Sequence, residues 1–251
     1  MRYAVKFAYN GLGFHGYARQ PNLKTIEGEI IKSFIKNGFF EDTKEANFRS
    51  ASRTDKDVSA LGNVIAFNSD QSKNDMISYL QELEDEIIFY GIKEVKDDFN
   101  PRFAKLRFYR YYLKIDDFDV DKIINVLSCF TGKHDFSNFA KIEEFKNPIR
   151  VIENIVCEKS NDLFKIDFFA PNFLWSQIRR IISSICKVSA EKISKEEVIE
   201  ALNNPDRIVD FGLAKAKPLI LKDIFYDFEF EIYKKQLRKI NDLERKIMLN
   251  L

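Results

Sequence analysis

The residues best suited to chemistry in this sequence are the neighbours Arg53, Thr54 and Asp55, which precede an apolar run at residues 64–67. A carboxylate placed where a loop leads into a buried strand is poorly solvated, and it costs free energy unless another group pairs with it or uses it. Asp55 is therefore a candidate catalytic group. A structural role is equally open at this point, in which Asp55 caps a turn and Arg53 forms an ion pair with it.

The elements that must position Asp55 can be predicted from the spacing of apolar residues and from turn residues. Residues 3–9 alternate as a strand does, and the glycine-rich residues 10–17 must form a loop with unusual backbone angles. Thr25 can cap a helix that ends at Gly38 and carries Ile35 on its apolar face. The further elements expected are strands at 64–68, 87–91, 108–115, 152–158, 163–169 and 224–232, and helices at 75–83, 121–130, 173–188, 194–203 and 233–251.

This order of elements favours an α+β fold. Hairpins and helices interleave, and the two halves of the chain have similar content. We therefore expect two related α/β lobes that share a mostly antiparallel or mixed sheet, with helices packed on one face. The expected division is an N-terminal lobe at residues 1–100, a C-terminal lobe at 101–231 and a basic amphipathic helix at 232–251.

Composition narrows the class of protein. The chain has 251 residues and is 45% hydrophobic, which is typical of a globular protein and not of a disordered one. No apolar run is long enough for a membrane span, and the first residues lack the apolar block of a signal peptide. Three widely spaced cysteines indicate reduced thiols and a cytoplasmic protein. The two histidines, His15 and His134, are too isolated for a zinc site, so no metal is expected.

The net charge of +1 does not by itself indicate a nucleic-acid-binding protein. RNA binding would need the positive charge to be segregated in space, because a local basic patch and not the total attracts phosphate. The tail at 232–251 is one candidate, since Lys234 and Lys235 begin a basic segment whose apolar stripe would include Leu237 and Leu251. Charge runs are more often simply solvated faces of a protein.

Several stretches of the sequence, in order, resemble the TruA family of tRNA pseudouridine synthases. Residues 53–64 are similar to the family's catalytic signature, which reads Gly-Arg-Thr-Asp, Gly-Val-His-Ala and Gly-Gln-Val, and Asp55 falls on its nucleophile. Residues 9–20 resemble the family's opening Tyr-Asp-Gly, Gly-Trp, Gln pattern, and residues 97–104 resemble its Phe-His-Ala-Arg-Phe-Ser segment. An ordered and dispersed set of matches is far more specific than the aspartate motif alone.

Two more matches lie in the second half of the chain. Residues 107–111 are similar to the family's Arg-Tyr-Arg-Tyr strand, and Tyr109 falls on its active-site tyrosine. Residues 173–181 resemble a helix of the family that carries the active-site arginine, and Arg179 falls on that position. The resemblance implies the pseudouridine synthase fold, with an active-site cleft between the lobes.

The sequence departs from the family pattern beside these positions. Ser52 and Asp57 stand where the family usually has glycine, and Ser59 stands where it usually has histidine. Trp175 begins a stretch that differs from the family before Arg179. The departures put substrate fit in question more than the chemistry. A second carboxylate at Asp57 would disfavour the ionised form of Asp55 if both faced the site.

The resemblance implies that the protein isomerises uridine to pseudouridine in tRNA without a cofactor, in the anticodon stem-loop around positions 38–40, as a cytoplasmic homodimer. Ionised Asp55 could stabilise charge at the anomeric carbon, attack that carbon or remove a ribose proton, and the sequence does not choose among these routes. Arg179 would hold the carboxylate through two hydrogen bonds. Tyr109 would stack on the uracil and relay a proton.

A uridine within a stem must leave its stack to be reached, which costs a few kcal/mol that phosphate contacts can offset. Basic side chains expected near the site are the candidates for these contacts. The residues assigned to RNA binding are Arg19, Arg53, Arg102, Arg110, Arg180, Lys234 and Lys235.

Three other functions remain open from the sequence. The protein could be a catalytically silent RNA-binding protein of the same fold, or a pseudouridine synthase that acts at another RNA site. It could also be an interaction module in which Asp55 and Arg179 form only a buried ion pair and the basic tail binds a partner.

Overall fold

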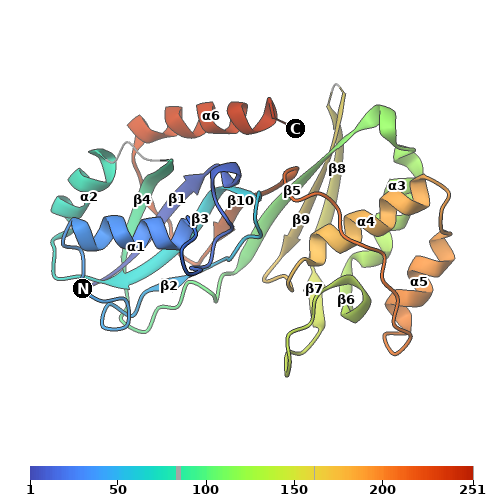
Figure 1. Ribbon diagram of the computed structural model, residues 1–251, viewed down its shortest axis with the longest axis horizontal. Coiled ribbons are helices and arrows are strands. Elements are labelled where there is room, and N and C mark those ends of the chain that lie inside the picture. The colour runs from blue at the N-terminus through green and yellow to red at the C-terminus, as the bar shows by residue number, and fades with distance from the viewer. Residues whose placement is uncertain (83–85, 161, 251) are drawn as a thin grey trace. The chain divides into compact units, whose positions relative to one another are not determined.

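The computed structural model describes residues 1–82, 86–160 and 162–250, and Figure 1 shows the arrangement of its elements. The strands are β1 (Arg2–Tyr9), β2 (Arg49–Ser50), β3 (Ser59–Asn68), β4 (Ile87–Val95), β5 (Leu106–Lys114), β6 (Gly132–Asp135), β7 (Ile149–Ile152), β8 (Asn154–Ser160), β9 (Leu163–Ala170), β10 (Leu219–Phe225) and β11 (Glu231–Ile232). The α-helices are α1 (Ile26–Lys36), α2 (Lys73–Glu82), α3 (Val120–Leu127), α4 (Gln177–Ser189), α5 (Lys195–Asn203) and α6 (Lys234–Met248). Short 3₁₀ helices lie at Gly11–Gly13, Ile115–Asp117, Ser128–Phe130 and Ser137–Phe139.

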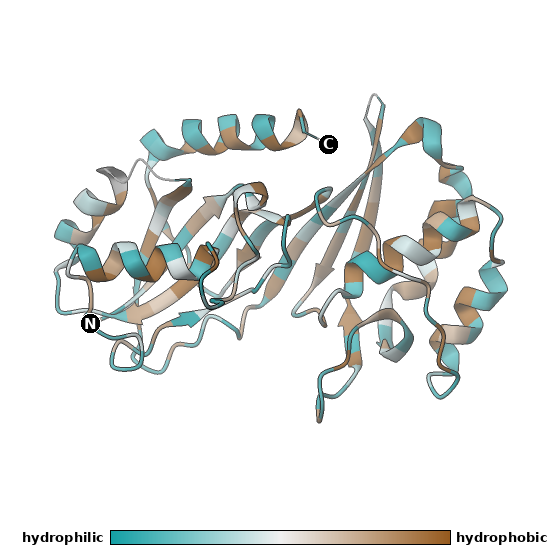
Figure 2. Cartoon of the chain, viewed as in Figure 1, coloured by the Kyte–Doolittle hydropathy of each residue, from teal (hydrophilic) through white to brown (hydrophobic). Residues whose placement is uncertain are grey.

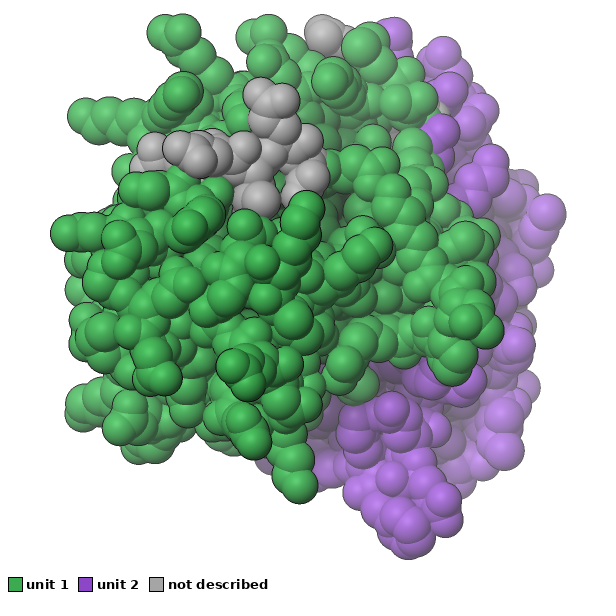
Figure 3. Space-filling model, turned by 60° about the vertical axis from the view of Figure 1, so that its left-hand side comes forward, with its two compact units in different colours: residues 1–105, 220–251 green, residues 106–219 purple. Residues whose placement is uncertain are grey.

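The chain forms two compact units, which Figure 3 shows in different colours. Unit 1 contains Met1–Lys105 and Ile220–Leu251, and unit 2 contains Leu106–Leu219. The chain therefore returns to the first unit after residue 219, whereas the sequence suggests three consecutive segments. In the part of the chain that the structure describes, no helix is long and apolar enough to cross a membrane.

The sheet of unit 1 is mixed, as the sequence predicts. Its strands follow the order β11, β4, β1, β3 and β10, and β2 pairs with β3. β1 is antiparallel to both neighbours, and β10 is parallel to β3. The register pairs Tyr3 with Phe67 and Val5 with Ile65, so large apolar side chains of adjacent strands lie beside one another. The motif at residues 53–64 leads directly into β3.

Helix α1 packs its apolar face on this sheet. Thr25 caps the helix by accepting a hydrogen bond from the Gly28 N–H, as predicted. The ring of Phe34 lies 5.1 Å from that of Phe67 and 5.2 Å from that of Phe89, which joins the helix to two strands. The prediction that Ile35 shares this face is wrong, because 44% of Ile35 is exposed and Ile31 is buried in its place.

Helix α6 contacts β4 and β3 through one buried stripe, formed by Gln236, Ile240, Leu243 and Ile247. Figure 2 shows hydrophobic and hydrophilic residues alternating along this helix, as expected for packing on one side. Leu237 does not belong to the stripe, because 40% of it is exposed and the polar Gln236 is buried instead. Leu251 lies outside the described residues. The tail is thus an amphipathic helix whose lysines face outward.

Unit 2 contains an antiparallel sheet and three α-helices. Its strands follow the order β5, β9 and β8, and a separate hairpin joins β6 to β7. Helices α3 and α4 pack against each other, and α5 contacts β6. A capping box begins α5, since Ser194 and Glu197 each bond to the other's backbone N–H.

Some boundaries differ from the sequence prediction. The alternation at 224–232 is not one strand, because β10 ends at Phe225 and β11 begins only at Glu231. The aromatic residues between them form ring contacts with Phe99 instead, at 5.3 Å for Tyr226 and 5.4 Å for Phe228. The strand predicted at 64–68 begins earlier, at Ser59, and includes the end of the motif at residues 53–64. The strands β6 and β7 were not predicted from the sequence, because a strand of four residues is too short to show a clear alternation.

Candidate active site and basic pocket

Asp55 opens a tight turn immediately before β3. The Val58 N–H donates a hydrogen bond to the Asp55 carbonyl at 3.2 Å, which closes a four-residue turn. The third residue of this turn, Asp57, has a φ of +68°, in the left-handed region. Glycine and asparagine are the usual residues at such a position, and aspartate tolerates it better than most. The backbone therefore explains why glycine suits this position in the family pattern and why Asp57 can replace it.

Thr54 anchors the turn from the side before Asp55. Its buried hydroxyl shares a hydrogen bond of 2.8 Å with the phenol of Tyr9, the last residue of β1. Its carbonyl accepts a hydrogen bond of 3.1 Å from the Tyr17 N–H. A buried threonine that bonds through both its side chain and its backbone fixes the position of the next residue. Asp55 is half-buried and is held at that fixed position.

The backbone of the turn at residues 55–58 packs closely against the glycine-rich loop at 10–17. A Cβ at Gly11 would stand 2.4 Å from the Val58 carbonyl oxygen, closer than any real contact. Gly16 has a φ of +92°, and a Cβ there would stand 3.3 Å from the Lys56 nitrogen. Because these two residues lack a Cβ, the backbones of the loop and the turn can lie in direct contact.

Two polar residues of β3 complete this support. The buried amide of Asn63 donates to the Ser52 carbonyl at 3.0 Å and accepts from the Val64 N–H at 2.8 Å. Ser59 is buried, and its hydroxyl accepts from the Gly11 N–H at 3.0 Å. Ser59, one of the departures from the family pattern, therefore has a structural task in this chain.

Tyr109 and Arg179 both belong to unit 2. Tyr109 lies on β5, and its half-buried ring meets that of Phe173 edge-on at 5.4 Å. Arg179 lies in the first turn of α4, and its Nε donates to the Ala214 carbonyl at 2.9 Å. The Ala214 N–H donates back to the Arg179 carbonyl at 3.1 Å. This reciprocal pair of bonds ties the segment at residue 214 to the start of the helix.

Tyr111 shows that Tyr109 and Arg179 lie on the same side of unit 2. Burial raises the pKa of Tyr111 above its ordinary value, Cys186 adds to this rise, and the positive charge of Arg179 opposes it. The Tyr111 phenol donates to the Lys215 carbonyl at 3.0 Å, and the Arg179 Nε donates to the carbonyl of the adjacent Ala214, so the two side chains reach the same segment. Since side chains two residues apart on a strand share a face, Tyr109 points to the same side of the sheet as Tyr111. The prediction that α4 begins at Phe173 is wrong, because Ser176 adopts a left-handed conformation and the helix starts at Gln177.

Unit 1 also contains a basic pocket of about 290 Å³. Its charged lining consists of the cations Arg19, Lys44, Arg49, Arg53 and Arg102 and the single carboxylate Glu27. Three of these cations were predicted from the sequence to bind RNA. Lys44 and Arg49 were not, because nothing in their local sequence distinguishes them from other exposed cations. Positive charge is thus segregated in this pocket although the chain as a whole is nearly neutral.

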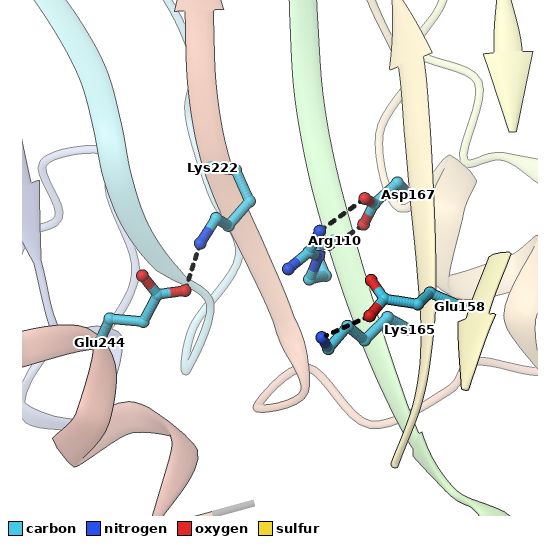
Figure 4. Close-up of polar contacts among 6 residues, drawn as sticks. All are labelled: Arg110, Glu158, Lys165, Asp167, Lys222 and Glu244. Carbon is cyan, nitrogen blue, oxygen red and sulfur yellow. Dashed lines mark hydrogen bonds and ion pairs between the residues drawn. The ribbon is translucent and has the colours of Figure 1, made fainter. Parts of the chain in front are cut away.

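The other predicted RNA-binding arginines are held by carboxylates. Arg110 forms two hydrogen bonds with Asp167, at 2.6 and 2.7 Å, and Figure 4 shows this pair. Arg180 lies 2.8 Å from Asp210, whose pKa is lowered mainly by the Gly212 N–H and also by Arg180. Both arginines have half-buried side chains. Their charges are therefore balanced within unit 2.

The two predicted lysines lie elsewhere in unit 1. Lys234 and Lys235 are exposed in the first turn of α6. The same helix is anchored to β10 by an ion pair between Glu244 and Lys222, which Figure 4 also shows. Their role in RNA binding stays a prediction.

The chain has clear relatives. A family model described as tRNA pseudouridine synthase matches residues 127–227. A protein named tRNA pseudouridine synthase A from Thermococcus sibiricus is 42% identical over 251 residues, which cover 98% of this chain and 93% of the relative. A protein of the same name from Pyrococcus furiosus is 38% identical, with 95% of this chain and 89% of the relative covered. The corresponding protein of Methanobrevibacter smithii is 35% identical, with coverages of 98% and 93%.

Solved structures give a much weaker match. A chain from a Cbf5–Nop10–Gar1 complex superposes with a TM-score of 0.37 at 15% sequence identity, covering 73% of this chain and 44% of that one.

Proposed function

We propose that this chain, which belongs to the tRNA pseudouridine synthase family, isomerises uridine to pseudouridine in tRNA with Asp55 as its catalytic carboxylate. Uridine isomerisation in tRNA follows from the family. The observation that best supports Asp55 as the catalytic residue is its fixed position in the structure. Asp55 is half-buried in a turn whose neighbours Thr54, Val58 and Ser59 are all fixed by hydrogen bonds.

The reaction breaks the N-glycosidic bond, turns the base and rejoins it to the ribose through carbon five. An ionised carboxylate beside the ribose can stabilise positive charge at the anomeric carbon, attack it or take a neighbouring proton. Each route requires a carboxylate whose position does not change between substrate and transition state. The rigid turn around Asp55 meets that requirement.

Tyr109 and Arg179 have complementary roles in this proposal. Arg179 supplies the positive charge that keeps Asp55 ionised when water is excluded, because a guanidinium does not lose its proton. Tyr109 offers its ring to the uracil and its phenol to the proton that leaves carbon five. Their placement on one side of unit 2 supports a joint role.

The finer parts of the function are also proposals. We expect the substrate uridines in the anticodon stem-loop, around positions 38–40, and we expect a homodimer that binds one tRNA across both subunits. The three cysteines are free thiols, which supports a reducing, cytoplasmic location. Light scattering on the purified protein tests the dimer, and mapping of pseudouridine in tRNA transcripts tests the positions.

The assignment of Asp55 is tested by Asp55→Asn, which keeps the size of the side chain and removes the charge. We expect pseudouridine formation in an unmodified tRNA transcript to fall by at least about a thousandfold, with the unfolding midpoint and the affinity for tRNA nearly unchanged. Asp70→Asn is the matched control, because Asp70 is an exposed aspartate of the same unit.

Normal turnover in Asp55→Asn would contradict the catalytic role. A large loss of folding stability in Asp55→Asn, with tRNA binding lost as well, would support the ion-pair function instead. Wild-type protein that binds tRNA but forms no pseudouridine would be the catalytically silent member of the fold.

A further inference from the structure

The basic pocket of unit 1 concentrates positive charge, and Lys44 and Arg49 are its two cations that were not among the predicted RNA-binding residues. We propose that this pocket binds a backbone phosphate of the RNA substrate, with Arg49 and Lys44 as phosphate-binding residues. The inference rests on the proposed function, since it assigns to the pocket a part of the same tRNA substrate.

The lining of the pocket carries an excess of positive charge. Five cations line it with one carboxylate, whereas the whole chain has 40 basic and 39 acidic residues. The carboxylate, Glu27, is already engaged, because it accepts hydrogen bonds from the Arg19 N–H at 3.1 Å and from the Ser50 hydroxyl at 3.3 Å. Its nearest guanidinium contact is the Nε of Arg19 at 3.9 Å. Glu27 is therefore not left to balance the charges of Lys44, Arg49 and Arg53, which line the same pocket.

Lys44, Arg49 and Arg53 are exposed cations of this pocket. Across the described residues, none of these three forms an ion pair with a carboxylate within 4 Å. Asp42 lies close to Lys44, but its carboxylate accepts the backbone N–H groups of Lys44 and Glu45, at 2.7 and 3.1 Å. Like charges gathered without counterions repel one another, so an anion that enters the pocket relieves a cost already present in the fold.

Arg2 joins the backbone near Arg49 to the backbone near Arg102. Its buried guanidinium donates to the carbonyl oxygens of Asn47 and Phe99 at 3.1 and 2.8 Å. Burial lowers the pKa of Arg2, and the charge of Arg49 lowers it further. Arg49 itself is exposed on β2, where it pairs with Ala66 of β3. The backbone under the pocket is therefore rigid, while the cationic ends of its side chains remain accessible.

The pocket has the dimensions of a phosphate site. A volume of about 290 Å³ corresponds to roughly ten water molecules, which accommodates a phosphodiester with part of its hydration shell. Arginine is well suited to such a ligand because its planar fork donates two parallel hydrogen bonds to phosphate oxygens. The pocket lies in the same unit as Asp55, so a phosphate bound here positions the strand relative to the catalytic turn.

The test compares Arg49→Gln and Lys44→Gln with wild-type protein in binding an unmodified tRNA transcript over a range of KCl concentrations. Each lost phosphate contact should reduce the slope of log affinity against log salt by about 0.7 to 0.9 and the affinity about sixfold near 0.1 M salt. Arg49→Lys should keep the slope and lose part of the affinity, because it keeps the charge but not the fork. Lys36→Gln is the control, since Lys36 is an exposed cation at the end of α1 outside the pocket.

The outcomes separate this inference from the proposed function. If wild-type and Lys36→Gln protein form pseudouridine and the Arg49→Gln and Lys44→Gln variants retain the wild-type slope, the phosphate site is refuted while the function stands. If the wild-type protein forms no pseudouridine but the slope falls as expected, the pocket binds RNA and the catalytic proposal fails. Unfolding midpoints measured on all variants show whether a lower affinity reflects misfolding.

Discussion

Arg49 and Arg53 of unit 1 and Arg110 and Arg180 of unit 2 are the same residue type in opposite environments. In unit 1, Arg49 and Arg53 line a pocket with other cations, and no carboxylate of the described residues pairs with them. In unit 2, Arg110 and Arg180 each pair with an aspartate at hydrogen-bond distance. The charge of the first pair is available to a ligand, and the charge of the second pair is balanced by the fold.

Arg110 shows how complete this balance is. Both carboxylate oxygens of Asp167 accept hydrogen bonds from the Arg110 guanidinium. These bonds raise the pKa of Arg110 above the ordinary value for arginine. Its guanidinium also lies over the rings of Phe108 and Tyr112, at 5.6 and 6.0 Å from their centroids. A guanidinium held in this way contributes to the sheet more than to RNA binding. The comparison teaches that pairing, and not residue type, decides which arginines can meet a phosphate.

The largest effect expected from this comparison is on folding. Arg110→Met should lower the free energy of unfolding by about 3 kcal/mol, because it leaves the buried carboxylate of Asp167 unpaired. The double variant Arg110→Met with Asp167→Leu should recover most of this loss. Urea unfolding measures both effects, with Lys114→Ala, at the exposed end of the same strand, as the control. If Arg110→Met instead keeps its stability and reduces the salt slope of tRNA binding, Arg110 is a phosphate contact and the comparison fails.

The cysteines provide a separate readout of unit 2 in the same experiment. Cys129, Cys157 and Cys186 all belong to unit 2. Burial raises the pKa of Cys129 to about 11 and that of Cys186 to about 12, so few thiolates exist at pH 8 in the folded unit. Unfolding returns these thiols to their ordinary pKa of about 8.5 and makes them reactive. Thiol labelling at this pH should therefore be faster in Arg110→Met than in the wild-type protein.

An intermediate effect is expected from two exposed phenylalanines. Phe103 follows Arg102 of the basic pocket and is 82% exposed, whereas Phe145 of unit 2 is 98% exposed and follows Glu143 and Glu144. Phe103→Ala should lower tRNA affinity about five- to tenfold, or roughly 1 kcal/mol, through loss of base stacking beside the phosphate site. The salt slope should not change, because stacking releases no counterions. Phe145→Ala is the matched control, and an equal loss of affinity in both variants would show that the pocket gives Phe103 no special role.

The smallest effect is expected in the turn that carries Asp55. Asp57→Gly should raise the free energy of unfolding by about 0.5 kcal/mol or less, because glycine adopts a φ of +68° without strain. The gain is small since glycine also loses more conformational entropy on folding. Thermal unfolding measures this change, with Asp70→Gly as the control at another exposed position. A clear loss of stability in Asp57→Gly would mean that the Asp57 carboxylate stabilises the turn, and that its contacts outweigh the strain.

Local patterns in the sequence determined much of this protein. The alternation of β1, the Thr25 cap of α1 and the capping box of α5 depend on residues close in the chain, and all are present in the structure. The ordered motifs likewise identified the family and the candidate residues Asp55, Tyr109 and Arg179. Such features can be predicted because each physical cause acts within a few residues.

Other features depend on partners distant in the sequence. Ile35 and Leu237 fit an apolar stripe by spacing but are exposed, since the sheet underneath decides which side of each helix is buried. The chain also returns from unit 2 to place β10 beside β3, which no local pattern indicates.

The basic pocket is the clearest product of the tertiary structure. Its lining comes from residues 19 and 27, from residues 43–53 and from residue 102, and only folding brings these segments together. The sequence supplied the cations and showed that their total is nearly cancelled by acids. Folding decided which of them are paired and which remain available, because electrostatic energy depends on distance in space and not on distance along the chain.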